Sequence, residues 1–209
     1  MACNNPAGNP KIFRDSTKTS KEELKPSDTL DDLFCINDAE QLKRIYGNKN
    51  VRTTRIVSME DEYYLGTILY ENTPDEVIIQ WKDTTNLSKV SSVRLACMYD
   101  QKSEKYIVDS KWFTRCGIVL GMPLTSVVEL NGVDFMFYGL GWDYGGGISD
   151  WKGGNLANKN IYVTLGVDDM TPEQEKQYLK ILGDKEYSSA NTAARNLDPM
   201  VFEIILSGK

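Results

Sequence analysis

The chain has 209 residues, of which 41% are hydrophobic and 26% charged, the composition of a folded globular protein. Its 24 basic and 30 acidic residues give a formal net charge of −6, which removes the electrostatic basis for nucleic-acid binding. The chain contains no histidine, which excludes Ser-His-Asp and Cys-His nucleophile systems, histidine-ligated metal sites and imidazole acid–base chemistry.

The first ten residues, MACNNPAGNP, lack the apolar run of a secretory signal peptide. They suit either a cytoplasmic protein or a mature lipoprotein whose leader has been removed, with Cys3 as the lipid-bearing residue. The following residues are polar and of mixed charge, as in a flexible tether. We therefore expect a tether over residues 1–26, membrane attachment only through a lipid on Cys3, and a periplasmic or outer-membrane location, with the cytoplasm as the alternative.

In the first half of the chain, the sequence predicts helices followed by strands. Residues 37–47 predict an amphipathic helix that Asn37 or Asp38 caps and Gly47 ends. Thr29 predicts the start of a shorter helix. Runs of β-branched and aromatic residues predict strands at residues 53–58, 63–71, 77–82 and 91–98.

Three cysteines lie in the part of the chain expected to fold. Cys35, Cys97 and Cys116 form no C-x-x-C pair, which argues against zinc binding and thioredoxin-like chemistry. One disulfide among them, or three buried thiols, are both consistent with the sequence.

The same order of elements returns in the second half. A helix begins near Pro123 and ends at Asn131-Gly132. Thr171 and Gln174 form a capping box for a helix over residues 171–183, whereas residues 184–199 show no strong pattern. Strands are predicted at residues 134–138, 147–151, 161–167 and 201–206.

A helix that ends in glycine and is followed by antiparallel strands thus occurs twice. We predict an α+β fold of two tandem modules, residues 27–110 and 111–209, each with helices packed on an antiparallel sheet. One sheet is expected from residues 50–100 and the other from residues 133–206, and the two should superpose.

Half of the 16 glycines lie between Gly132 and Gly154, together with six aromatic residues. We interpret the glycines as shaping a strongly bent hairpin whose rings fill the space they leave, with Phe135 and Phe137 in the core. The alternative is an aromatic patch for a protein or glycan partner, because Trp and Tyr often anchor interfaces. Its residues would be Trp142, Asp143, Tyr144 and Trp151.

The acidic residues of this segment allow two readings. Asp143 and Asp150 could form a carboxylate pair or a calcium site, but Asp143 between two aromatic residues suits a turn cap better. The spacing Gly139-Leu140-Gly141 resembles a dinucleotide fingerprint only superficially, because no helix start follows it. We predict no catalytic residues, no metal and no cofactor.

The segment GMPLTSVVELNGVDFMFYGLGWDYGG resembles a motif of uncharacterised envelope lipoproteins from Bacteroidetes-type bacteria, over roughly residues 115–156. This resemblance implies an envelope lipoprotein and no activity. A broader similarity is to the SmpA-type barrel-assembly lipoprotein fold, and its tandem form is similar to the β-lactamase inhibitor protein fold. The positions matching the SmpA-type helix are Gly121, Met122, Val127, Leu130 and Gly132, with Asn131 inserted before the last glycine.

The sequence therefore predicts a non-catalytic binding or assembly module of the cell envelope, with an unidentified protein or glycan partner. One alternative is a small-molecule or glycan-binding protein that uses the hairpin from Trp142 to Trp151. Another is an enzyme that uses Asp143 with Tyr144 or Tyr138. A deep pocket around Asp143 would favour the enzyme, and a shallow exposed aromatic face would favour partner or glycan binding.

Overall fold

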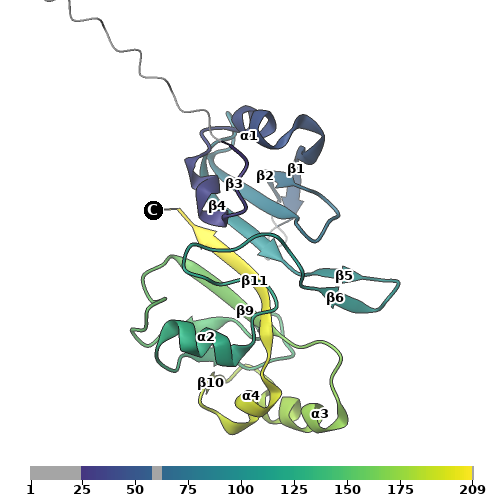
Figure 1. Cartoon of the computed structure of the whole chain (residues 1–209), viewed down its shortest axis with the longest axis vertical. Helices are drawn as coiled ribbons and strands as arrows, with labels where there is room; N and C mark the ends of the chain where they lie inside the picture. Colours follow the sequence, from purple (N-terminus) through teal and green to yellow (C-terminus); the bar gives the residue numbers. More distant parts are fainter. Residues whose placement is uncertain (1–24, 58–62, 209) are drawn as a thin grey trace, which may run out of the picture.

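The computed structural model describes residues 25–57 and 63–208. Its centre is a six-stranded antiparallel sheet with the order β1-β2-β3-β4-β11-β9 (Figure 1). A second sheet has the order β10-β7-β8, and the β5–β6 hairpin projects from the side of the molecule. The strands are β1 (Val51–Val57), β2 (Tyr63–Leu69), β3 (Val77–Asp83), β4 (Ser88–Ala96), β5 (Met98–Asp100), β6 (Lys105–Ile107), β7 (Met136–Tyr138), β8 (Ile148–Asp150), β9 (Ile161–Gly166), β10 (Glu186–Ser188) and β11 (Met200–Ser207).

A continuous row of apolar side chains runs across all six strands of the large sheet. Directly opposed residues form this row from one edge to the other, and every member is buried because the helices and connections pack on this face. Its members are Val51, Leu69, Val77, Leu95, Ile204 and Val163. The helical elements are η1 (Leu30–Cys35), α1 (Ala39–Tyr46), η2 (Asn48–Asn50), α2 (Leu124–Asn131), α3 (Pro172–Tyr178), η3 (Leu179–Ile181) and α4 (Thr192–Leu197).

The helix starts predicted at Asp38 and Thr171, and the helix end predicted at Gly47, are confirmed. The Asp38 side chain accepts a hydrogen bond from the Gln41 backbone N–H at the start of α1, and Gly47 ends that helix with φ of 89°. The Thr171–Gln174 capping box is formed at the start of α3. Thr29 precedes a 3₁₀ helix, and its side chain makes no capping hydrogen bond.

The α+β class is confirmed, but the two separate sheets are not found. β11, the last strand, pairs with β4 of the first half, so β9 and β11 extend the sheet made by β1 to β4. The physical reason is that Ile204 and Leu206 lie opposite Leu95 and Val93 and continue the buried apolar surface. This contact joins residues about half the chain apart, and no local pattern indicates it.

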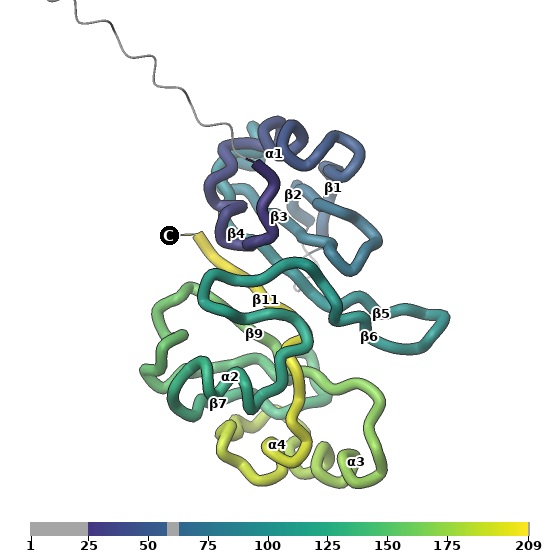
Figure 2. The backbone as a smooth tube through the Cα atoms, in the orientation of Figure 1, coloured from purple at the N-terminus to yellow at the C-terminus, as the bar shows by residue number. Residues whose placement is uncertain are grey.

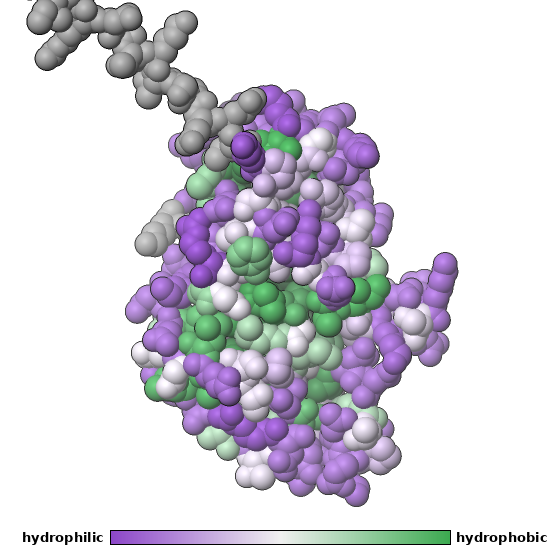
Figure 3. Space-filling view, in the orientation of Figure 1, coloured by the Kyte–Doolittle hydropathy of each residue, from purple (hydrophilic) through white to green (hydrophobic). Residues whose placement is uncertain are grey.

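Figure 2 shows the connection between β6 and α2, residues 108–123, crossing the face of the large sheet near β11. It is tied to β11 by two backbone hydrogen bonds, from Gly121 N–H to the Val201 carbonyl at 2.8 Å and from Val201 N–H to the Met122 carbonyl at 2.9 Å. Figure 3 shows an apolar band over this connection. Phe113, which is 45% exposed, belongs to the same connection.

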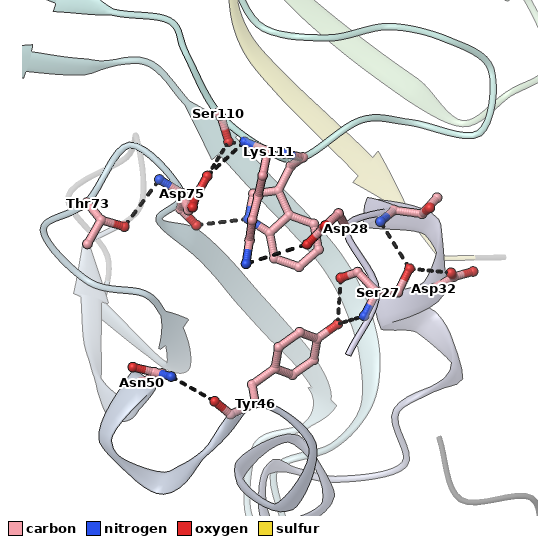
Figure 4. Close-up of polar contacts among 11 residues, drawn as sticks. Ser27, Asp28, Asp32, Tyr46, Asn50, Thr73, Asp75, Ser110 and Lys111 are labelled. Atoms are coloured by element: carbon pink, nitrogen blue, oxygen red, sulfur yellow. Dashed lines mark hydrogen bonds and ion pairs between the residues drawn. The ribbon is translucent and has the colours of Figure 1, made fainter. Parts of the chain in front are cut away.

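Hydrogen bonds and an ion pair connect the start of the described chain to both halves of the molecule (Figure 4). The Tyr46 hydroxyl donates to the Ser27 carbonyl at 3.1 Å. The Lys111 Nζ lies 3.5 Å from the Asp28 carboxylate, and Asp75 accepts a hydrogen bond from the Lys111 N–H at 2.9 Å. Residue 27, where the expected tether ends, is therefore held in place. Cys3 and tether residues 1–24 lie outside the described residues.

Candidate functional site: an aromatic corner

The glycine-rich segment forms a turn that closes one edge of the large sheet. Within the turn, Tyr138 N–H donates to the Gly147 carbonyl and Gly146 N–H donates to the Tyr138 carbonyl, each at 2.9 Å. Leu165 N–H on β9 then donates to the Gly146 carbonyl at 2.9 Å, and Gly147 forms a β-bridge with Thr164. The turn is thus a short extra partner for β9.

The turn requires glycine at several positions. Gly141 and Gly146 have φ of 81° and 80°, a region that side-chain-bearing residues rarely adopt. A Cβ on Gly146 would collide with the Leu165 carbonyl oxygen, and one on Gly147 would collide with the Tyr162 hydroxyl. The prediction that the glycines shape the backbone is therefore confirmed.

Two aromatic side chains project from this turn into solvent. Trp142 is 36% exposed and Tyr144 is 51% exposed. Their ring centroids lie 5.4 Å apart in an edge-to-face arrangement, and Trp142 makes a similar contact with Tyr138 at 5.9 Å. The Trp142 Nε1–H donates to the Gly139 carbonyl at 2.9 Å, which fixes the indole while leaving part of it open.

Tyr162 on β9 completes an aromatic corner, defined here as Tyr138, Trp142, Tyr144 and Tyr162. Tyr162 is 36% exposed, and its hydroxyl lies where a Cβ of Gly147 would be. Burial is the main cause that raises the pKa of Tyr162, and Tyr138 contributes to the shift. Sequence reasoning missed Tyr162, although the alternation Ile161, Val163, Leu165 marks it as outward-facing.

Trp151 does not join the other predicted site residues. It is only 9% exposed, and its ring packs against Phe135 at 5.4 Å between centroids. Phe135 and Phe137 are fully buried, as predicted. The backbone carbonyl of Trp151 accepts a hydrogen bond from the buried Asn131 side chain, which anchors this end of the hairpin to α2. The hairpin therefore has an exposed tip and a buried base.

Asp143 is exposed on the tip and does not act as the predicted turn cap. No hydrogen bond or ion pair links its carboxylate to residues 25–57 or 63–208. A backbone bond from Gly145 N–H to the Trp142 carbonyl, at 2.8 Å, closes the turn instead. Asp150 caps a turn, because it accepts a hydrogen bond from Lys152 N–H at 2.7 Å and pairs with the Lys152 ammonium group at 2.9 Å, and both contacts lower its pKa. Among the described residues, no group of three or more acidic or cysteine side chains is placed to hold a metal ion.

The three cysteines of the folded part are free thiols. Cys35 is exposed, whereas Cys97 and Cys116 are half-buried. Burial raises the pKa of Cys97 to about 11, so its thiol stays protonated near neutral pH and is a poor nucleophile.

A pocket of about 340 Å³ lies on the other face of the large sheet, where β4 leads into β5. Arg94 in this pocket is ion-paired with Glu203, whose other oxygen accepts a hydrogen bond from Thr164. The lining residues are Asn72, Thr73, Glu76, Ile78, Arg94, Ala96, Cys97 and Met98. Asp143 is not among them.

No family model, curated protein or solved structure matches the chain. No helix in the described part of the chain is long and apolar enough to cross a membrane. The family resemblance therefore stays a prediction, and the functional argument depends on the geometry of the aromatic corner.

Proposed function

We propose that the chain is a non-catalytic binding module of the cell envelope and that a partner docks on the aromatic corner. The observation that carries this proposal is the exposure of Trp142 and Tyr144 on a turn whose backbone is held by glycine geometry and by β9. Rings that are already ordered lose little conformational entropy on binding, which is one reason why Trp and Tyr anchor interfaces.

The ring geometry favours a protein partner. The plane of Trp142 lies at 67° to that of Tyr144 and at 85° to that of Tyr138, so the three rings do not form one flat platform. A pyranose ring stacks best on a single flat face, which these inclined rings do not offer, whereas side chains of a protein partner can pack against rings at several angles. The exposed Asp143 carboxylate, which has no hydrogen-bond or ion-pair partner within the described part of the chain, supports glycan binding as the second candidate, since it can accept hydrogen bonds from sugar hydroxyl groups.

The envelope location rests on the sequence, through Cys3 and the polar tether. The hydrogen bonds between Ser27 and Tyr46 support it, because they fix where the tether joins the folded part and would orient that part relative to an anchor. Mass spectrometry of the protein from its own host should find a diacyl or triacyl group on Cys3. An unmodified Cys3 would contradict the lipoprotein proposal and leave the binding proposal intact.

The finer division into two helix-plus-sheet modules, residues 27–110 and 111–209, is also a proposal. Each half contains helices, and the strands of both halves contribute to the large sheet that they share. Its test is expression of residues 27–110 alone, which should remain unfolded by circular dichroism if the shared sheet is essential and should fold if the halves are independent modules.

Docking on the aromatic corner can be tested with a photo-crosslinking p-benzoylphenylalanine in place of Tyr144. In the native host, irradiation should give a discrete protein adduct that weakens when Trp142→Ala is added. The matched control places the crosslinker at Leu179, which is 67% exposed and lies in η3. Equal adducts from both positions, or none from position 144, would contradict a protein partner. A change in tryptophan fluorescence on addition of cellohexaose or chitohexaose, absent from the Trp142→Ala variant, would instead support the glycan candidate.

A further inference from the structure

The two edges of the large sheet differ in whether their outer backbone groups are hydrogen-bonded. On β9, the outer edge is occupied by the glycine-rich turn through Gly146 and Gly147. On β1, the Val51 N–H donates to the Asn48 carbonyl, whereas the other backbone groups on the side away from β2 have no backbone partner among residues 25–57 and 63–208. An edge strand of seven residues whose outer backbone groups are largely unpaired is a template for one more strand.

The pairing of β1 with β2 shows which residues face outward. The Tyr70 N–H donates to the carbonyl of Asn50, its direct partner in the register of these strands. Hydrogen-bonded and non-hydrogen-bonded pairs alternate along an antiparallel ladder, so Arg52 and Thr54 turn their peptide groups toward β2. Thr53 and Arg55 therefore present their N–H and C=O groups outward.

Basic side chains are concentrated at this edge of an acidic chain. Arg52 and Arg55 on β1 are exposed, as are Arg44 at the end of α1 and Lys49 in η2 just before β1. Of these four, only Arg52 is ion-paired within the described residues, to Glu71. Arg44, Lys49 and Arg55 thus have no ion-pair partner among the described residues, in a chain whose formal net charge is −6.

We propose that the edge of β1 receives an extended, acidic segment of a partner protein as a seventh strand of the large sheet. Backbone hydrogen bonds to Thr53 and Arg55 would supply affinity, and acidic side chains near Arg55 and Lys49 would supply selectivity. This surface is separate from the aromatic corner, which lies at the β9 edge of the same sheet. The alternative role of the basic residues is to discourage edge pairing.

The first test uses the full chain and a fluorescent seven-residue peptide of alternating glutamate and valine, followed by anisotropy. The same peptide with lysine in place of glutamate is the control. Saturable binding of the acidic peptide at least about tenfold tighter than that of the basic one is expected. Absent binding, or equal binding of the two peptides, would overturn the proposal.

Two substitutions locate the binding. Thr53→Pro removes an outward N–H, which an edge strand tolerates, and should weaken binding of the acidic peptide by about tenfold, whereas Thr53→Val should not. Arg55→Glu should reverse the preference between the two peptides without any change in backbone donors. If Thr53→Pro unfolds the protein, protection of the Thr53 and Arg55 amides from hydrogen exchange by the peptide gives the same answer.

Two further outcomes separate this proposal from the alternatives. A concentration-dependent dimer in sedimentation velocity that Arg55→Glu abolishes would assign the edge to a second copy of the chain and overturn the acidic-partner proposal. Trp142→Ala should leave peptide affinity unchanged. Equal loss from Trp142→Ala would show that the peptide binds the aromatic corner and would also overturn it.

Discussion

The tip and the base of the glycine-rich hairpin have similar compositions and opposite environments. At the base, Phe135, Phe137 and Trp151 are buried against one another and against the core. At the tip, Trp142 and Tyr144 are exposed and contact each other by their edges. The difference comes from the backbone, because the base follows strand alternation and the tip follows left-handed turns at Gly141 and Gly146.

Aromatic residues that are close together in the sequence can therefore have different roles, some in the core and others at the surface. The base stabilises the fold through burial of apolar area. The tip retains solvent-exposed rings although its backbone is tightly constrained. Substitutions that separate these contributions are the sharpest tests of the proposed binding surface.

The largest effect is expected for Trp151→Ala at the base. It removes a buried ring that packs on Phe135, and we expect the free energy of unfolding to fall by about 3–5 kcal/mol. Urea denaturation measures this loss. Leu179→Ala, at a side chain that is 67% exposed, is the control and should change stability by less than about 0.5 kcal/mol. Equal losses from the two variants would remove the distinction between buried and exposed positions.

Gly146→Ala should have the next largest effect, about 2–4 kcal/mol. It combines a positive φ with a collision between the new Cβ and the Leu165 carbonyl oxygen. Gly153→Ala is the matched control, because Gly153 also has a positive φ of 72° but nothing lies within 4 Å of an added Cβ. Its expected cost is about 1 kcal/mol. Equal costs by thermal unfolding would show that the contact with β9 contributes nothing to the turn.

Asp150→Asn should cause a smaller and pH-dependent loss of stability. The contacts with Lys152 lower the pKa of Asp150 below its ordinary value, so they stabilise the fold at pH values above the pKa of this carboxyl in the unfolded chain. The contribution is lost as pH falls through the lowered folded-state pKa. The melting temperatures of wild type and Asp150→Asn should therefore differ at pH 7 and converge once the pH lies below the lowered folded-state pKa. A difference that persists in acid would contradict this account.

Asp143→Asn should have the smallest effect, with an unchanged melting temperature at pH 7, because no hydrogen bond or ion pair links its carboxylate to the described residues. Calcium should not shift the melting temperature of the wild type, since the described residues contain no cluster suited to a metal ion. A calcium-dependent increase that Asp143→Asn abolishes would show that a metal site is present and that the tip was misinterpreted.

Much of the local structure was predictable from the sequence. Asp38, Thr171 and Gly47 marked helix ends correctly, because caps depend on neighbouring residues. The pairing of β11 with β4 was not predictable, since it depends on which distant apolar strands fit together. The hairpin β5–β6 was missed because each strand has only three residues.

The candidate site was predicted in part. Trp142, Asp143 and Tyr144 share the exposed tip, as the alternative of an aromatic patch required, whereas the favoured interpretation had these rings filling the space left by the glycines. Trp151 was grouped with them because sequence proximity does not show to which side a strand residue points. Tyr162 was missed because it reaches the tip from β9, about 20 residues away in sequence.

The central claim is that the rings at the tip are held out for a partner and are not needed for the fold. Its most direct test is the free energy of unfolding of the double variant Trp142→Ala/Tyr144→Ala in urea. The account predicts a loss of at most about 2 kcal/mol, because both rings are partly exposed and the glycine-shaped backbone is unchanged. A loss of about 4 kcal/mol or more, comparable to that of Trp151→Ala, would contradict it.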